Sequence, residues 1–148
     1  LAEMIGQTRD EGFGDEVKRR ILLGTFVLSA DAFDAYYVKA QRVRRVVRDE
    51  LAARLSEVDV LASPTAPTVA PRLGANAEDP LAMYLSDVLT LPASLAGLPA
   101  ISLPSGLSPE GLPIGLQLVG RPFDEATVLR VAAAYEAMAE VRAMEPPR

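Results

Sequence analysis

The sequence predicts an α/β protein in which a largely buried sheet carries helices on its faces. Two observations support this prediction. Apolar residues recur at intervals of three and four over long segments, which is the spacing of one helical face. Between these segments lie short, nearly continuous apolar runs at 58–62, 100–103 and 114–119, and such runs are typical of strands covered on both faces by helices. The resulting order is helix, helix, strand, helices, strand, strand, helix, which is an α/β arrangement of layers.

The first clearly marked helix is expected after the glycines of the segment EGFGD, with Asp15 as a candidate N-cap. Its apolar stripe contains Val17, Ile21, Leu22, Phe26 and Leu28. Gly24 lies in the middle of this helix, where glycine costs about 1 kcal/mol of helix propensity relative to alanine. We therefore expect the helix to pack closely against another element at Gly24.

A second, longer helix is predicted from Asp31 or Asp34 to Val58. Its predicted buried face contains Tyr36, Ala40, Val43, Val47, Leu51 and Leu55. Its opposite face carries Lys39, Arg42, Arg45, Arg48, Asp49 and Arg54. Acidic residues are interleaved toward the end of this face and no aromatic ladder accompanies the arginines, so a solvated face is favoured over its alternative, an RNA-binding patch.

The remaining elements alternate with proline-rich connections. A helix is predicted from Pro80 to the residue before Pro92, with an apolar stripe made of Leu81, Tyr84, Leu85, Val88 and Leu89. A short helical turn closed by Gly97 follows, then two strands, and a last helix that starts at Asp124 or Glu125. The core stripe of that last helix is predicted to be Val128, Val131, Ala132, Tyr135 and Met138. Because three strands are few for so much apolar helix surface, we expect the sheet to continue in residues absent from this chain.

The composition excludes several classes of function. The 148 residues are 49% hydrophobic and 24% charged, which is ordinary for one globular domain. The net charge of −5 disfavours nucleic-acid binding by this chain alone, because such binding needs a basic surface. The absence of cysteine excludes disulfides and zinc–thiolate sites, and the absence of histidine excludes a Ser-His-Asp triad within the chain. No apolar run approaches the roughly 20 residues of a transmembrane helix, and no signal-peptide pattern is present, so we expect a cytoplasmic protein that does not contact a membrane.

Nucleophilic chemistry has no clear candidate. Four serines lie near predicted strand ends, at Ser63, Ser94, Ser102 and Ser105. None occupies a Gly-x-Ser-x-Gly turn or has a basic partner at a predictable spacing. We interpret them as turn residues and packed strand ends.

Two charged positions stand out against their apolar surroundings. Arg19 and Arg20 are consecutive in the first helix, and since successive helical residues point about 100° apart, one of them is expected to face inward. Asp87 falls at the edge of the apolar stripe beside Met83 and Tyr84. A half-buried carboxylate must be paired or hydrogen-bonded, or its pKa shifts. An arginine and Asp87 either pair with each other or face a ligand that carries both a carboxylate and an ammonium group.

Several segments resemble the amidase signature family over about residues 8–140. LPASLAGLPAISLPSG and GLPIGLQLVG are similar to amidase signature enzymes in general. EVKRRILLGT, DAYYVKAQ and DPLAMYLSD are more similar to the glutamine-using members of the family, the A subunits of aspartyl/glutamyl-tRNA(Asn/Gln) amidotransferases. The resemblance implies a mixed β-sheet sandwiched between helices, incomplete in this chain, with residues 1–148 as the C-terminal portion of a single amidase signature domain.

The resemblance also implies that different subunits carry out different steps of the reaction. The glutamine-using members hydrolyse glutamine with the family's Ser–cis-Ser–Lys triad, which lies in their N-terminal half, and the released ammonia converts misacylated Glu-tRNA(Gln) or Asp-tRNA(Asn) in a complex with B and C subunits. ATP and Mg²⁺ are used by the B subunit, and the misacylated tRNA is reached through the complex. By position in the matching motifs, Arg20 is implied to bind the α-carboxylate of glutamine and Asp87 its α-amino group, with Arg19 the less favoured alternative to Arg20.

The triad has no counterpart here, because neither Lys18 nor Lys39 has the required sequence context. The chain is therefore expected to hold no catalytic residue, metal or cofactor, and to be inactive alone. Two alternatives remain: a portion of another amidase signature hydrolase that acts on a different amide, and a non-catalytic module that docks to a partner in a complex.

Overall fold

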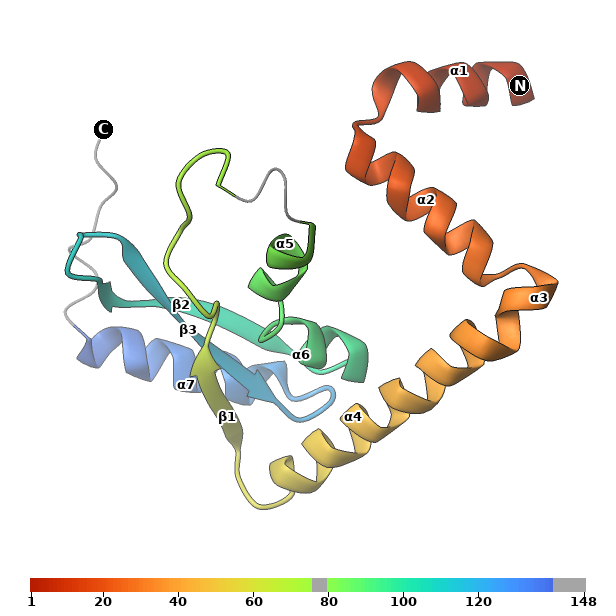
Figure 1. The fold of residues 1–148 in the computed structure, drawn as a ribbon. Coiled ribbons are helices and arrows are strands. Elements are labelled where there is room, and N and C mark those ends of the chain that lie inside the picture. Colours follow the sequence, from red (N-terminus) through yellow and green to blue (C-terminus); the bar gives the residue numbers. More distant parts are fainter. Residues whose placement is uncertain (76–79, 140–148) are drawn as a thin grey trace. The chain divides into compact units, whose positions relative to one another are not determined.

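The structure is a computed structural model that describes residues 1–75 and 80–139. The chain divides into two compact units, Leu1–Val43 and Arg44–Arg148, and each unit is described by itself. The first unit is helical and the second contains the sheet (Figure 1).

The first unit contains helices α1 (Ala2–Gly12), α2 (Asp15–Val27) and α3 (Ala30–Ala32), the π-helix η1 (Phe33–Val38) and the start of α4 (Lys39–Leu55). The N-cap of α2 is Gly14 rather than Asp15. Asp15 lies instead in the first turn, together with Glu16, where acidic side chains complement the positive end of the helix dipole.

The apolar stripe of α2 is exposed, contrary to the expectation of close packing. No residue of α2 is buried, and Leu22 is 70% exposed. A Cβ added at Gly24 would meet no described heavy atom within 4 Å apart from the backbone of its own helix. Within residues 1–43, all of which the structure describes, Ala32 is the one residue classed as buried.

One aromatic contact links α2 to η1, and a second lies within η1. The rings of Phe26 and Tyr36 have centroids 5.8 Å apart, and those of Phe33 and Tyr37 are stacked at 4.9 Å. Such pairs add to the stability that area burial alone supplies.

The predicted buried face of the second helix becomes buried only toward its C-terminal end. Tyr36 and Val43 are exposed, Val47 and Leu51 are half-buried, and Leu55 is 1% exposed. The helical spacing therefore predicted the helix correctly, but its buried face only in the second unit.

The sheet of the second unit has three antiparallel strands, β1 (Val60–Pro64), β2 (Ala100–Leu107) and β3 (Pro113–Gly120), in the order β1-β3-β2. All three predicted strands are confirmed, and each extends past its predicted end. Leu118 of β3 is paired with Ala62 of β1 and with Ile101 of β2.

Helix α7 (Glu125–Met138) covers one face of this sheet, as Figure 1 shows. The core between them is made of Leu118, Val128 and Ala132, with Val60, Ile101, Leu103, Leu116 and Val131 packed around it. Gly120 allows the close approach, because any Cβ at that position would run into Val128. Met138, predicted as part of the core stripe, is 85% exposed at the end of the helix.

Residues 88–93, which connect helix α5 (Pro80–Ser86) to the first part of α6 (Leu91–Ala96), border the opposite face of the sheet. Val88, Leu89 and Ala93 line a small cavity of about 210 Å³ there, together with residues of the sheet and of α4. Gly97 ends α6 in the left-handed conformation (φ 72°), as predicted.

Helix α5 ends earlier than predicted, at Ser86 rather than just before Pro92. The backbone N–H groups of Asp87 and Val88 bond to carbonyls three residues back, which tightens the chain out of the α-helix. Pro92 has no N–H to continue an α-helical ladder, and the chain starts a separate helix at Leu91. The predicted stripe of α5 is largely exposed, with Leu81 at 65% and Leu85 at 54%.

Candidate functional site

Asp87 lies in the turn that follows α5, and its backbone is held firmly. Its carbonyl oxygen accepts hydrogen bonds from the backbone N–H groups of Thr90 and Leu91, both at 3.0 Å, and from the Thr90 hydroxyl at 3.1 Å. Its own N–H donates to the Tyr84 carbonyl at 3.3 Å. Three donors on one carbonyl fix the position from which the Asp87 side chain projects.

The Asp87 carboxylate is exposed rather than half-buried, which corrects the sequence-based expectation. Within the described residues of its own unit, 44–75 and 80–139, it makes no hydrogen bond or ion pair with another side chain. The reason is that α5 ends before Asp87, so the side chain leaves the apolar stripe instead of lying along its edge. The turn thus presents a negative charge on a fixed backbone, a geometry suited to an ammonium group.

A cavity of about 630 Å³ borders the residue before Asp87. Its lining includes Ser86, the proline-rich segment 64–71, and Ser102 and Gly115 of the sheet. The hydroxyls of Thr65 and Ser102 are hydrogen-bonded to each other at 2.7 Å. Gly115 makes room for this pair, since a Cβ there would lie 2.7 Å from the Thr65 hydroxyl oxygen. The cavity wall is mostly apolar, and the hydroxyl groups of Thr65 and Ser102 lie together in it.

Arg19 and Arg20 share one carboxylate on α2. Arg19 Nη1 lies 2.7 Å from one oxygen of Glu16, and Arg20 Nε lies 2.9 Å from the other. Both arginines are exposed, so the expectation that one of them faces inward was wrong for this unit, in which α2 has no buried residue. The three side chains sum to a charge of +1, which complements an anion.

Arg20 belongs to the first unit and Asp87 to the second. The two sequence-based alternatives, an ion pair between them or a ligand that they share, therefore both stay predictions. Within its own unit, Arg20 contacts its helical neighbour Glu16.

Sequence reasoning missed Gln117. This glutamine lies in the apolar run of β3, is 5% exposed, and is one of two buried polar residues among those described. Its Nε2 donates to the Ser63 hydroxyl at 3.1 Å and to the Leu89 carbonyl at 2.9 Å. A lone amide inside an otherwise apolar strand was the available signal, since a buried polar group needs partners.

Two carboxyl groups of the described residues, Glu110 and Asp124, have a lowered pKa, and hydrogen bonding to Ser108 is the main cause at Glu110. The Thr127 hydroxyl, by hydrogen bonding, holds the pKa of Asp124 below its ordinary value of 3.8, and Arg121 acts in the same direction through its charge. Arg121 Nε lies 3.6 Å from this carboxylate, and Arg121 Nη2 lies 2.8 Å from Asp59. This cluster joins the start of β1 to the turn before α7 and has a structural role.

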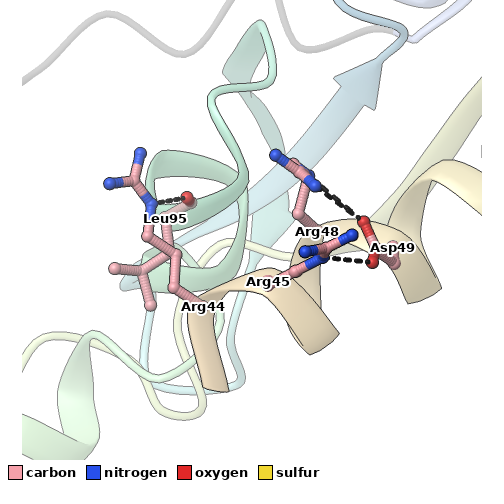
Figure 2. Close-up of polar contacts among 5 residues, drawn as sticks. All are labelled: Arg44, Arg45, Arg48, Asp49 and Leu95. Atoms are coloured by element: carbon pink, nitrogen blue, oxygen red, sulfur yellow. Dashed lines mark hydrogen bonds and ion pairs between the residues drawn. The ribbon is translucent and has the colours of Figure 1, made fainter. Parts of the chain in front are cut away.

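The arginine-rich face of α4 is exposed and partly neutralised. Figure 2 shows Arg45 and Arg48 reaching the same carboxylate, Asp49, at 3.6 and 3.0 Å. Arg44 instead donates to the carbonyl oxygen of Leu95 in α6 at 2.6 Å (Figure 2). The arrangement agrees with the solvated-face interpretation, because two of the arginines share an acid rather than standing free for phosphates.

The described residues offer neither a metal-ligand cluster nor a single membrane-spanning helix. Among them, no group of three or more His, Cys, Asp or Glu side chains could hold a metal ion. No single helix in that part of the chain is long and apolar enough to cross a membrane; the bent pair Asp15–Val27 and Ala30–Leu55 meets the criteria together, by length and composition only.

Comparison with known proteins identifies the family. The sequence pattern of the Amidase family matches residues 1–129. The chain is 56% identical over 143 residues to the A subunit of the glutamyl-tRNA(Gln) amidotransferase of Parvibaculum lavamentivorans, covering 97% of this chain and 29% of that protein. The chain thus spans under a third of the length of this curated relative, and the portion that it matches is C-terminal.

Solved structures agree with this assignment. The crystal structure of the glutamyl-tRNA(Gln) amidotransferase A subunit from Thermotoga maritima matches with a TM-score of 0.70 and 49% identity, over 94% of this chain and 30% of that one. The allophanate hydrolase of Kluyveromyces lactis matches with a TM-score of 0.71 and 27% identity, over 93% of this chain and 22% of that one. The predicted α/β fold class is confirmed, and the chain belongs to the amidase family.

Proposed function

We propose that this chain is part of the glutamine-hydrolysing A subunit of a tRNA-dependent amidotransferase, and that it supplies a wall of the glutamine pocket. The observation that carries the proposal is the difference in identity within one family. The chain is 49% identical to an A subunit of known structure and 27% identical to an allophanate hydrolase of known structure, although its TM-scores with the two are 0.70 and 0.71. The shared fold alone does not separate these activities, whereas the higher sequence identity favours the amidotransferase.

In this proposal Asp87 binds the α-amino group of glutamine and Arg20 its α-carboxylate. The exposed Asp87 carboxylate, on a backbone fixed by three hydrogen bonds, supports the first role. The net positive charge of Arg19, Arg20 and Glu16 supports the second. An exposed ion pair such as that of Arg20 with Glu16 is worth only about 0–1 kcal/mol, so this pair by itself would not prevent a substrate carboxylate from binding the guanidinium.

The remaining steps belong to other parts of the assembly. The Ser–cis-Ser–Lys triad that attacks the glutamine amide would come from the part of the protein outside this chain. Partner B and C subunits would complete the complex, with ATP and Mg²⁺ used by the B subunit to activate the misacylated tRNA. The chain alone would then be inactive, and the complete enzyme would act in the cytoplasm as part of the translation machinery.

Steady-state kinetics of the full-length enzyme in its complex test the proposal. We expect Asp87→Ala and Arg20→Ala each to raise the KM for glutamine by about 10- to 100-fold, because a charge-assisted hydrogen bond contributes about 1.5–3 kcal/mol. The triad serine should still react with an active-site acylating probe, since neither residue takes part in nucleophilic attack.

Two matched variants serve as controls. Arg19→Ala removes a neighbouring guanidinium that pairs with the same Glu16 carboxylate, and Glu136→Ala removes an exposed carboxylate from α7. Glu136→Ala should leave the KM for glutamine within about twofold, and Arg19→Ala should raise it less than Arg20→Ala does. An unchanged KM in Asp87→Ala would contradict the proposal, and a larger effect of Arg19→Ala than of Arg20→Ala would transfer the carboxylate role to Arg19.

A further inference from the structure

Gln117 connects the sheet to the turn that carries Asp87. Its side chain lies on the face of β3 opposite α7, between β1 and the segment after α5. From there the amide donates one hydrogen bond across the sheet, to Ser63 of β1, and one out of the sheet, to the carbonyl oxygen of Leu89. Leu89 is two residues after Asp87 in the same turn.

Burial makes these two bonds obligatory. A buried amide that loses its partners bears the full cost of its desolvation, so the amide and both of its acceptors must stay together in the folded state. Gln117 is 5% exposed, and none of the buried side-chain polar atoms in the described residues lacks a partner. The position of Leu89 relative to β3 is therefore set by a polar contact with a defined length and direction.

The other contacts beneath the turn are apolar and leave space. Gln117, Ser63 and Leu89 line the cavity of about 210 Å³ together with Val88, Leu61 and other apolar side chains. Apolar contacts are non-directional, so across an incompletely filled cavity they do not fix the position of the turn relative to the strand. Among the described residues, the Gln117–Leu89 hydrogen bond supplies a directional contact between the strand and the turn.

We propose that Gln117 is a positioning residue for substrate binding. By holding the Leu89 carbonyl, it fixes the turn 87–90 on the sheet and thereby aims the Asp87 carboxylate at the α-amino group of the substrate. The inference rests on the proposed function, since it assigns to Asp87 the recognition of an amino group. It adds a residue that does not touch the substrate and acts only through Asp87.

A double-mutant cycle in the full-length enzyme, assembled with its partners, tests the inference. Gln117→Met keeps the length of the side chain and removes both donors. We expect it to raise the KM for glutamine by about 5- to 10-fold, with kcat within about twofold, because binding of one charged group loses its alignment. In an Asp87→Ala background the same substitution should raise the KM no further, since there is no carboxylate left to aim.

Two further measurements separate positioning from general damage. Thr127→Val removes the other buried polar side chain among the described residues, on α7, and should leave the KM for glutamine within about twofold even though it lowers stability. Amidation driven by ammonium chloride in place of glutamine bypasses the glutamine pocket, so its rate should be the same in Gln117→Met and wild type. Gln117→Asn, which keeps an amide but is too short to span the same gap, replaces Gln117→Met if the ammonium-driven rate shows that the methionine variant is misfolded.

Each outcome supports or overturns the positioning role. A rise in KM that disappears in the Asp87→Ala background supports it. If Asp87→Ala raises the KM and the Gln117 variant does not, or if the two effects multiply in the double mutant, the positioning role is overturned and the proposed function stands. If Asp87→Ala itself leaves the KM for glutamine unchanged, both the proposed function and the positioning role of Gln117 are contradicted.

Discussion

The helical unit and the sheet unit contain the same kind of amphipathic helix, but they differ in what those helices bury. In Leu1–Val43, all of which the structure describes, Ala32 alone is classed as buried and α2 exposes its whole apolar stripe. In the described part of the second unit, α7 buries Val128 and Ala132 against β3. The difference shows that helical spacing predicts a helix from local chemistry, whereas burial requires a complementary surface, which the sheet provides for α7.

Two glycines of β3 differ from Gly24 of α2 in the same way, because in the sheet another element comes close to the glycine. Gly120 and Gly115 of β3 lie against side chains that a Cβ would strike, whereas Gly24 of α2 has open space around it. The same residue type therefore has a packing role in one unit and costs helix propensity in the other.

The largest expected effect comes from one substitution made in both units. Leu118→Ala empties a position that is 4% exposed in the core beneath α7, and should lower the free energy of unfolding by about 2–5 kcal/mol. Leu22→Ala, at a position that is 70% exposed on α2, should change it by less than about 0.5 kcal/mol. Urea unfolding of the chain followed by circular dichroism measures both. Equal losses of stability would show that the α2 stripe is packed as tightly as the sheet core, which would contradict the difference in burial between the two units.

A matched pair of glycine substitutions should give smaller effects of opposite sign. Gly115→Ala brings a methyl group to 3.0 Å from the Thr65 Cβ and should destabilise the sheet unit by about 1–3 kcal/mol through overpacking. Gly24→Ala should stabilise α2 by about 1 kcal/mol, because alanine has the higher helix propensity and nothing crowds the new methyl group. The same urea experiment measures both changes. Destabilisation by Gly24→Ala would reveal a close neighbour of α2 and restore the expectation of tight packing there.

The smallest expected effect is a pH dependence confined to the sheet unit. Because the pKa of Asp124 is lowered on folding, its ionised form stabilises the folded state above the ordinary value of 3.8, and this contribution is lost as the pH falls through the lowered pKa. Asp124→Asn should therefore be less stable than wild type at pH 7, and the difference should shrink below pH 3.8. Thermal unfolding of both proteins across this range tests the sign. A difference that grows with acidification would contradict the assignment of Thr127 and Arg121 as the causes.

Local sequence patterns predicted the elements of the fold more accurately than its burial. The three strands and α7 were predicted correctly, because continuous apolar runs and turn residues are local signals. The predicted end of α5 was too late in the sequence. The prediction used Pro92 as the end of the helix, but the helix ends where Asp87 and Val88 bond to carbonyls three residues back, and the position of Pro92 does not indicate those hydrogen bonds. The exposed stripe of α2 was also misjudged, because a periodic pattern does not show whether its partner surface lies in the same unit.

The candidate site was predicted only in part. Asp87 and Arg20 were selected by their resemblance to family motifs, and their roles remain predictions. Their exposure was misjudged for the same reason as the burial of α2 and α5. Gln117 was not predicted as a site residue, because its proposed role depends on a hydrogen bond to Leu89, 28 positions away in the chain. A contact between residues so far apart produces no periodic pattern in the sequence.

The most direct test of the account measures recognition of the α-amino group. Glutaramate is glutamine without that group, so the ratio of the two KM values isolates the contact assigned to Asp87. In the assembled full-length enzyme, wild type should have a KM at least about tenfold lower for glutamine than for glutaramate. Asp87→Ala should raise the KM for glutamine toward that for glutaramate and leave the glutaramate value unchanged. A variant that keeps the wild-type ratio would contradict the assignment of Asp87 as the ammonium-binding residue.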